Sequence, residues 1–150
     1  MLKLGCATLS MWTVFNLVPS SFILVNTMFF GGHTPALYTI LGGGEVNSLS
    51  AEQLATVDSI AVYANGTNIA FCLISLVVVW MGLNRKLPWV FWGLLVGFTV
   101  ALIAGVAADH AVGTVFPEVN VISALILAFG FMFSAIGLFR KTKVGQHHPR

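Results

Sequence analysis

The sequence predicts an all-α integral membrane protein in which four transmembrane helices form an up-down bundle. Of its 150 residues, 57% are hydrophobic and only 8% are charged, and the charged residues cluster between long uncharged runs. A soluble domain carries about 25% charged residues, so seven basic and five acidic residues cannot cover a water-exposed surface. This composition excludes a soluble enzyme, a disordered protein and a nucleic-acid binder.

The uncharged runs set the number of helices. A transmembrane helix needs about 20 consecutive apolar residues. The runs 59–84, 87–108 and 119–139 each fit one helix, and the run 4–44 fits one helix and a long connection. The predicted spans, all within a single domain over residues 1–150, are 8–30, 57–82, 88–108 and 119–139.

The charge distribution predicts the orientation in the membrane. Basic residues lie before the first span, between the second and third, and after the fourth. With four spans these places share one side, which the positive-inside rule assigns to the cytoplasm. Both termini are therefore predicted on the cytoplasmic face of a bacterial inner membrane, with all acidic residues on the outer face. The basic residues are Lys3, Arg85, Lys86, Arg140, Lys141, Lys143 and Arg150, and the acidic residues are Glu45, Glu52, Asp58, Asp109 and Glu118.

The first span and the connection after it carry local signals. Pro19 removes a backbone donor inside the span and predicts a kink. In the connection, Thr34 and Pro35 form a helix start, with threonine as the cap and proline at the first helical position. A short helix over 36–41 is expected to lie at the outer membrane surface, and the three glycines at 42–44 would end it.

The second and third helices have clear starting points. Ser50 and Gln53 match a capping box, which predicts that the second helix begins near Ala51 and runs to Leu83. That length exceeds the thickness of the hydrocarbon core, so the helix is expected to protrude on the outer side. Pro88 is predicted to open the third helix, because its missing N–H costs nothing in the first turn.

Each span carries a stripe of small or polar residues at helical spacing. Helices in lipid associate through close packing and interhelical hydrogen bonds rather than through the hydrophobic effect. The third span has a small-xxx-small pattern, which predicts close packing on a neighbouring helix or on a partner subunit. This stripe consists of Gly93, Gly97, Ala101 and Gly105.

The second span has the most polar stripe. Asn65 and Asn68 are expected to pack in the bundle interior. A sharper interpretation is that these two asparagines, together with Asn16 of the first span, line a polar pocket or path. The whole stripe consists of Asp58, Ala61, Asn65, Asn68, Cys72 and Ser75.

The outer ends of the spans hold the candidate ligand-binding residues. Two histidines and several carboxylates at one level are a plausible first shell for a divalent metal, whose identity stays unknown. Two axial histidines could instead hold a haem b. The simpler interpretation is that all are ordinary polar groups at helix ends. These residues are His33, Asp58, Asp109, His110 and Glu118.

The sequence provides no catalytic constellation. No charged residue or histidine is predicted at mid-membrane depth, where proton-coupled transporters usually need one. No serine lies in a nucleophile elbow or beside a matched base. The leading hypothesis is therefore a non-catalytic accessory or stabilising subunit of a larger membrane complex, in contact with a membrane-protein partner or a second copy of itself. The alternative is an outer-leaflet binding module for a metal, haem, quinone or lipid.

Overall fold

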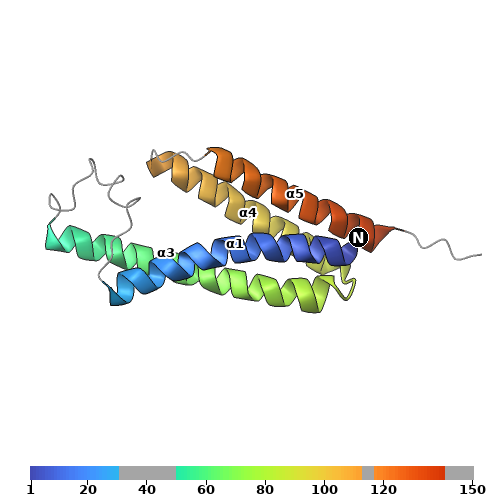
Figure 1. Cartoon of the computed structure of the whole chain (residues 1–150), viewed down its shortest axis with the longest axis horizontal. Coiled ribbons are helices and arrows are strands. Elements are labelled where there is room, and N and C mark those ends of the chain that lie inside the picture. Colours follow the sequence, from blue (N-terminus) through green and yellow to red (C-terminus); the bar gives the residue numbers. More distant parts are fainter. Residues whose placement is uncertain (31–49, 113–116, 141–150) are drawn as a thin grey trace, which may run out of the picture.

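The computed structural model describes residues 1–30, 50–112 and 117–140, and this part of the chain is entirely helical (Figure 1). Four helices are long and apolar enough to cross a membrane, which confirms the predicted all-α class and the number of spans. The short helix predicted over 36–41 lies outside the described residues. The elements are α1 (Leu2–Phe29), α3 (Ala51–Val78), the π-helical turn η2 (Val79–Leu83), α4 (Pro88–Val112) and α5 (Pro117–Phe139).

Two of the helix starts follow the local signals in the sequence. At the start of α3, the Ser50 hydroxyl accepts a hydrogen bond from the backbone N–H of Gln53 at 3.2 Å. The Gln53 side chain in turn accepts from the backbone N–H of Ser50 at 2.9 Å, which completes the capping box. Helix α4 begins at Pro88, as predicted. Helix α1 continues through Pro19 and begins six residues before the predicted span.

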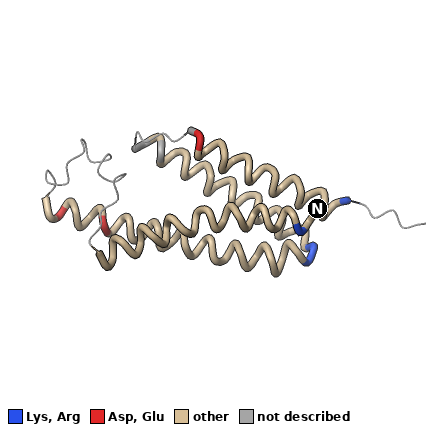
Figure 2. The backbone as a smooth tube through the Cα atoms, in the orientation of Figure 1, with Lys and Arg blue, Asp and Glu red and all other residues tan. Residues whose placement is uncertain are grey.

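Charged residues separate to the two ends of the molecule (Figure 2). We call these the basic end and the acidic end. The beginning of α1, the turn between η2 and α4, and the end of α5 all lie at the basic end (Figure 1). The described charges are Lys3, Arg85, Lys86 and Arg140 at the basic end, and Glu52, Asp58 and Glu118 at the acidic end.

Helix α1 occupies a central place, because it packs along both α3 and α5. Helix α4 packs against α5 and against the π-helical turn η2. Figure 1 shows the pair α1 and α3 meeting the pair α4 and α5 near the basic end, while the two pairs diverge toward the acidic end. The helices are therefore tightly joined at one end and separated at the other.

Glycines allow the backbones of α1 and α5 to approach each other closely near the basic end. A Cβ atom added to Gly5 would meet the Ser134 hydroxyl and lie 2.5 Å from the Ser134 backbone nitrogen. A Cβ added to Gly137 would lie 2.5 Å from Leu2 Cα. Small residues favour this kind of helix association in lipid. The close-packing contact of the bundle is therefore between α1 and α5.

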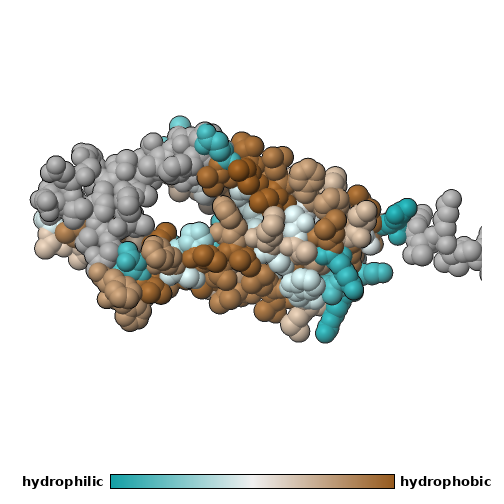
Figure 3. Space-filling model, viewed as in Figure 1, coloured by the Kyte–Doolittle hydropathy of each residue, from teal (hydrophilic) through white to brown (hydrophobic). Residues whose placement is uncertain are grey.

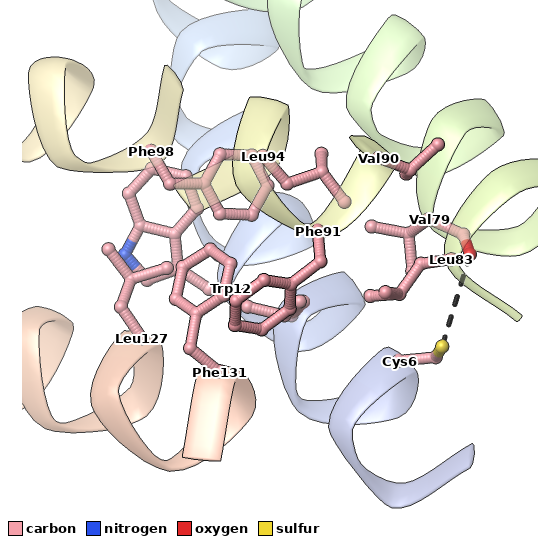
Figure 4. Packing of buried hydrophobic residues seen from close by; sticks show 11 residues of the cluster. Cys6, Trp12, Val79, Leu83, Val90, Phe91, Leu94, Phe98, Leu127 and Phe131 are labelled. Atoms are coloured by element: carbon pink, nitrogen blue, oxygen red, sulfur yellow. Dashed lines mark hydrogen bonds between the residues drawn. The ribbon is translucent and has the colours of Figure 1, made fainter. Parts of the chain in front are cut away.

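An aromatic cluster fills the interior beside this contact (Figure 4). Phe98 of α4 is fully buried at its centre. Its ring centroid lies 4.8 Å from Trp12 on α1, 5.7 Å from Phe71 on α3 and 6.0 Å from Phe131 on α5. One side chain thus contacts rings from the three other helices. The cluster continues toward the basic end through Cys6, Leu9, Val79, Leu83, Val90, Phe91 and Leu94.

The outward faces of the helices are apolar. Phe22, Tyr63 and Trp89 are each more than two-thirds exposed (71%, 77% and 70%). Exposed apolar patches this large are rare on monomeric soluble proteins and are normal where lipid replaces water. The described surface supports a multi-pass membrane protein in a lipid environment.

Candidate functional site

Where the helix pairs diverge, they enclose a cavity of about 850 Å³. Residues from all four helices line it. Figure 3 shows an opening between the two pairs in the surface of the molecule. Among the described residues, the cavity is therefore open toward the side of the bundle.

The cavity lies between the middle of the membrane and the acidic end. Trp12, at its inner limit, is about 15 Å along α1 from Leu2 at a rise of 1.5 Å per residue. Gly105, near its outer limit, is about 25 Å along α4 from Pro88 by the same measure. Because the hydrocarbon core is about 30 Å thick, the cavity occupies roughly one leaflet of a bilayer.

Small residues on α4 leave this space open. Gly97, Ala101, Ala104 and Gly105 all line the cavity. A Cβ added to Gly97 would meet only a Phe71 ring atom, at 3.8 Å, and one added to Gly105 would meet nothing within 4 Å among the described residues. Protein interiors are normally packed without voids of this size. In a membrane, hydrocarbon chains or a bound molecule would fill the cavity.

Hydrogen-bonding side chains from three helices lie in the cavity wall. The Trp12 indole N–H donates to the Ser123 hydroxyl and so links α1 to α5. Asn16 donates from Nδ2 to the Trp12 carbonyl oxygen at 2.8 Å. Asn68 donates from Nδ2 to the Ser20 hydroxyl at 2.8 Å, which links α3 to α1. These bonds fix the orientation of polar groups inside the hydrocarbon region.

The rest of the wall is uncharged and, apart from Thr67 and Asn120, apolar. Phe15 and Phe71 present aromatic rings to the cavity, and Trp12, which is 4% exposed, borders it with a small part of its surface. Phe98 packs behind Trp12 and Phe71. None of the lining residues is Asp, Glu, Lys, Arg, His or Cys. The site therefore combines apolar walls with a few oriented neutral hydrogen-bonding groups, which is the usual composition of a small-molecule site.

No protein-family model, curated protein or solved structure matches the chain.

The sequence located part of this site. Of the three asparagines considered for a polar pocket, Asn16 and Asn68 line the cavity, whereas Asn65 is not in the lining and donates to the Ala61 carbonyl oxygen of its own helix at 2.8 Å. Sequence reasoning missed the roles of Trp12 and Ser123. The only available signal was the place of Ser123 in the small and polar stripe of the fourth span.

The predicted outer-face ligand residues are only partly described. His110 and Glu118 are exposed, and Asp58 is half-buried. His33 and the side chain of Asp109 lie outside the described residues. Among the side chains that the structure describes, no group of three or more His, Cys, Asp or Glu could hold a metal ion. A metal or haem site at these five positions stays a prediction.

The small-residue stripe of α4 does not take part in the close contact between α1 and α5. Gly97, Ala101 and Gly105 line the cavity. Gly93 lines a separate hollow of about 220 Å³, together with Phe71 and Trp89. A Cβ added to Gly93 would meet nothing within 4 Å in the described part of the chain. Within the described residues, no other helix packs closely on the glycines of this stripe. Its packing on a partner subunit stays a prediction.

Proposed function

We propose that this multi-pass membrane protein is a binding module that holds a neutral amphiphile in its lateral cavity. The observation that carries the proposal is a cavity of about 850 Å³ with oriented hydrogen-bonding groups inside the hydrocarbon region. Its volume falls within the range of roughly 300–1,000 Å³ typical of ligand sites.

The uncharged lining supports a neutral ligand. A phosphate or ammonium group inside the hydrocarbon region would need an opposite charge or a water-filled path. The lining offers neither an acidic nor a basic side chain. It also lacks the histidines and thiolates that would hold a metal or a haem iron. Of the four ligand classes that the sequence left open, a quinone or a neutral lipid fits this cavity better.

We further propose a bacterial inner membrane in which the helices run up and down, with the basic end and both termini facing the cytoplasm. The positive-inside rule supports this orientation, because every described lysine and arginine lies at the basic end (Figure 2). The cavity would then lie in the outer leaflet. A ligand that partitions into lipid would reach it without crossing the membrane.

Native mass spectrometry of protein extracted gently from its own membranes tests the proposal. We expect a constant small mass increment on the chain, and we expect Ala104→Phe to reduce the bound fraction strongly. Ala104 lines the cavity, so a phenyl ring there would occupy part of the ligand's volume.

Ala128→Phe is the matched control, because Ala128 is exposed on α5 and is not part of the lining. This variant should keep the increment. A wild-type protein without any bound small molecule, or an increment that survives equally in both variants, would contradict binding in this cavity.

A second candidate function is an accessory or stabilising subunit of a membrane complex. The specific observation in its favour is the open α4 stripe beside the hollow of about 220 Å³. Trp89, at the edge of this hollow, is 70% exposed. A transmembrane helix of a partner subunit, or of a second copy, could place a side chain in the hollow and approach the glycines closely.

Gly93→Leu tests this second function. A Cβ at Gly93 meets nothing within 4 Å in the described structure, and the rest of the leucine would extend into the hollow. We therefore expect the folded protein to persist while co-purification of the partner is lost. Gly66→Leu is the control, since a Cβ at Gly66 on α3 also meets nothing within 4 Å in the described structure. Wild-type association of the Gly93→Leu protein would argue against a partner on this face.

A further inference from the structure

We infer that the polar head of the bound amphiphile is a flat conjugated ring with carbonyl acceptors, which is the chemistry of an isoprenoid quinone. The ring would lie at the deep end of the cavity against Trp12, with one carbonyl oxygen accepting a hydrogen bond from Ser123. This inference rests on the proposed function, because it names the class of molecule that fills the same cavity.

The depth of the polar groups carries the first step. Glycerolipids keep their polar atoms at the membrane interface and place only hydrocarbon near the midplane. Trp12 lies about 15 Å along α1 from Leu2, and its partner Ser123 lies about 9 Å along α5 from Pro117. The hydrogen bond between them is therefore inside a hydrocarbon core about 30 Å thick, in the half toward the acidic end. A ligand matched to this cavity therefore carries a hydrogen-bonding group into the hydrocarbon region.

The hydrogen-bond direction carries the second step. The Ser123 hydroxyl oxygen accepts from the Trp12 indole, so the hydrogen of this hydroxyl is the part of the group that can donate. A polar group that is buried in an apolar setting is stabilised by a partner. A carbonyl oxygen on the ligand is a neutral acceptor that can take this hydrogen without bringing a charge.

The aromatic lining carries the third step. Trp12 and Phe71 both contact the fully buried Phe98, with ring centroids 4.8 and 5.7 Å from its own. Packing on Phe98 therefore fixes the orientation of both rings. Phe15 adds a third ring to the wall. Aromatic side chains pack favourably against other flat conjugated rings in offset or edge-to-face arrangements. A quinone ring supplies such a surface, whereas an acyl chain or a polyprenyl alcohol does not.

The opening between the helix pairs provides a path for the apolar tail of the quinone (Figure 3). A quinone carries an apolar tail on its ring, and the walls toward the acidic end include Ala64, Ala104 and Val119, with the Asn120 amide beside them. The tail would pass over these side chains and out between the pairs into the surrounding lipid. Ring and tail thus match the two chemically different parts of the cavity.

Tryptophan fluorescence tests the inference, because quinones quench an indole that they contact. The chain has four tryptophans, and Trp80, Trp89 and Trp92 are all exposed. A full-length variant with these three replaced by phenylalanine keeps Trp12 as its single reporter. We expect a decyl-substituted para-benzoquinone to quench Trp12 emission with a saturating curve in detergent micelles. The reciprocal variant Trp12→Phe keeps the other three reporters, and its quenching should rise without saturation as quinone dissolves in the micelle.

Substitution of Ser123 adds a test of the hydrogen bond. In the single-tryptophan protein, Ser123→Ala should weaken quinone binding about tenfold, equal to about 1.4 kcal/mol. Ser123→Thr retains a hydroxyl and should restore most of the affinity. Since Ser123→Ala also removes the acceptor of the Trp12 indole, the emission maximum without quinone shows whether the ring environment has changed. Equal affinity in the alanine and wild-type proteins would overturn the proposed hydrogen bond.

The outcomes separate this inference from the function on which it rests. Saturable quenching of Trp12 together with a native mass increment supports both. An increment without saturable quenching, with dioleoylglycerol retained in place of the quinone, means that a ring-free neutral lipid fills the cavity, so the quinone inference is wrong and the binding function stands. Absence of both signals contradicts both.

Discussion

Replacing Phe98 with alanine is expected to cost about 3–5 kcal/mol of unfolding free energy, the range seen when a large aromatic side chain is removed from a packed core. Phe98 is fully buried, and its ring contacts Trp12, Phe71 and Phe131 on the three other helices. Figure 4 shows Phe98 with Trp12 and Phe131. The alanine variant would lose all three ring contacts. Titration with a denaturing detergent, followed by the fluorescence of the folded protein, measures the loss.

Phe129→Ala is the matched control for this prediction. Phe129 is half-exposed, and its stacked partner is Phe133 on the same helix, with ring centroids 6.2 Å apart. Its removal should therefore shift stability by only about 0.5 kcal/mol or less, as is usual for exposed positions. A loss of similar size in both variants would show that the cluster around Phe98 is not the main contact between the helix pairs.

Gly5→Ala is expected to produce the second large effect, a loss of about 1–3 kcal/mol from overpacking. The added methyl group would meet the Ser134 hydroxyl and lie 2.5 Å from the Ser134 backbone nitrogen. A backbone atom cannot rotate away, so α1 and α5 must move apart along their contact. The thermal stability of the purified protein, measured as the fraction that stays monodisperse after heating, reports this change.

Gly66→Ala provides the comparison with the same chemical change. A Cβ at Gly66 meets nothing within 4 Å in the described structure, and alanine favours a helix over glycine. This variant should match or slightly exceed the wild type. If Gly5→Ala is as stable as Gly66→Ala, the two helix backbones are farther apart at Gly5 than the structure indicates.

Local signals explain how much of the fold could be predicted from the sequence. Uncharged runs long enough for a membrane span identified all four helices, because the cost of burying charge in hydrocarbon acts on each segment separately. The capping box at Ser50 and the proline at position 88 identified two helix starts, because each acts within one turn. None of these signals depends on how the helices pack.

The cavity depends on that packing, which explains why it was only partly predicted. Trp12 and Ser123 are 111 residues apart, so neither marks the other in the sequence. Glycine spacing is also ambiguous, because a missing side chain either lets a backbone approach or leaves a space. On α5 the small residue Gly130 allows approach, with Leu9 Cδ2 2.7 Å from its Cβ position, whereas Gly105 on α4 leaves a space. The interpretation of the α4 stripe as a packing surface could not separate these two outcomes.

If the proposed amphiphile binds in the cavity, the opening between the helix pairs determines which ligand concentration governs its binding. A molecule that enters from the side of the bundle equilibrates with the lipid phase, so occupancy follows its mole fraction in the bilayer rather than its level in water. A strongly hydrophobic ligand is already enriched in that phase, and mass action then fills the site even when the intrinsic preference over neighbouring lipids is modest. Release would return the molecule to the same leaflet, which allows exchange without passage through the aqueous phase.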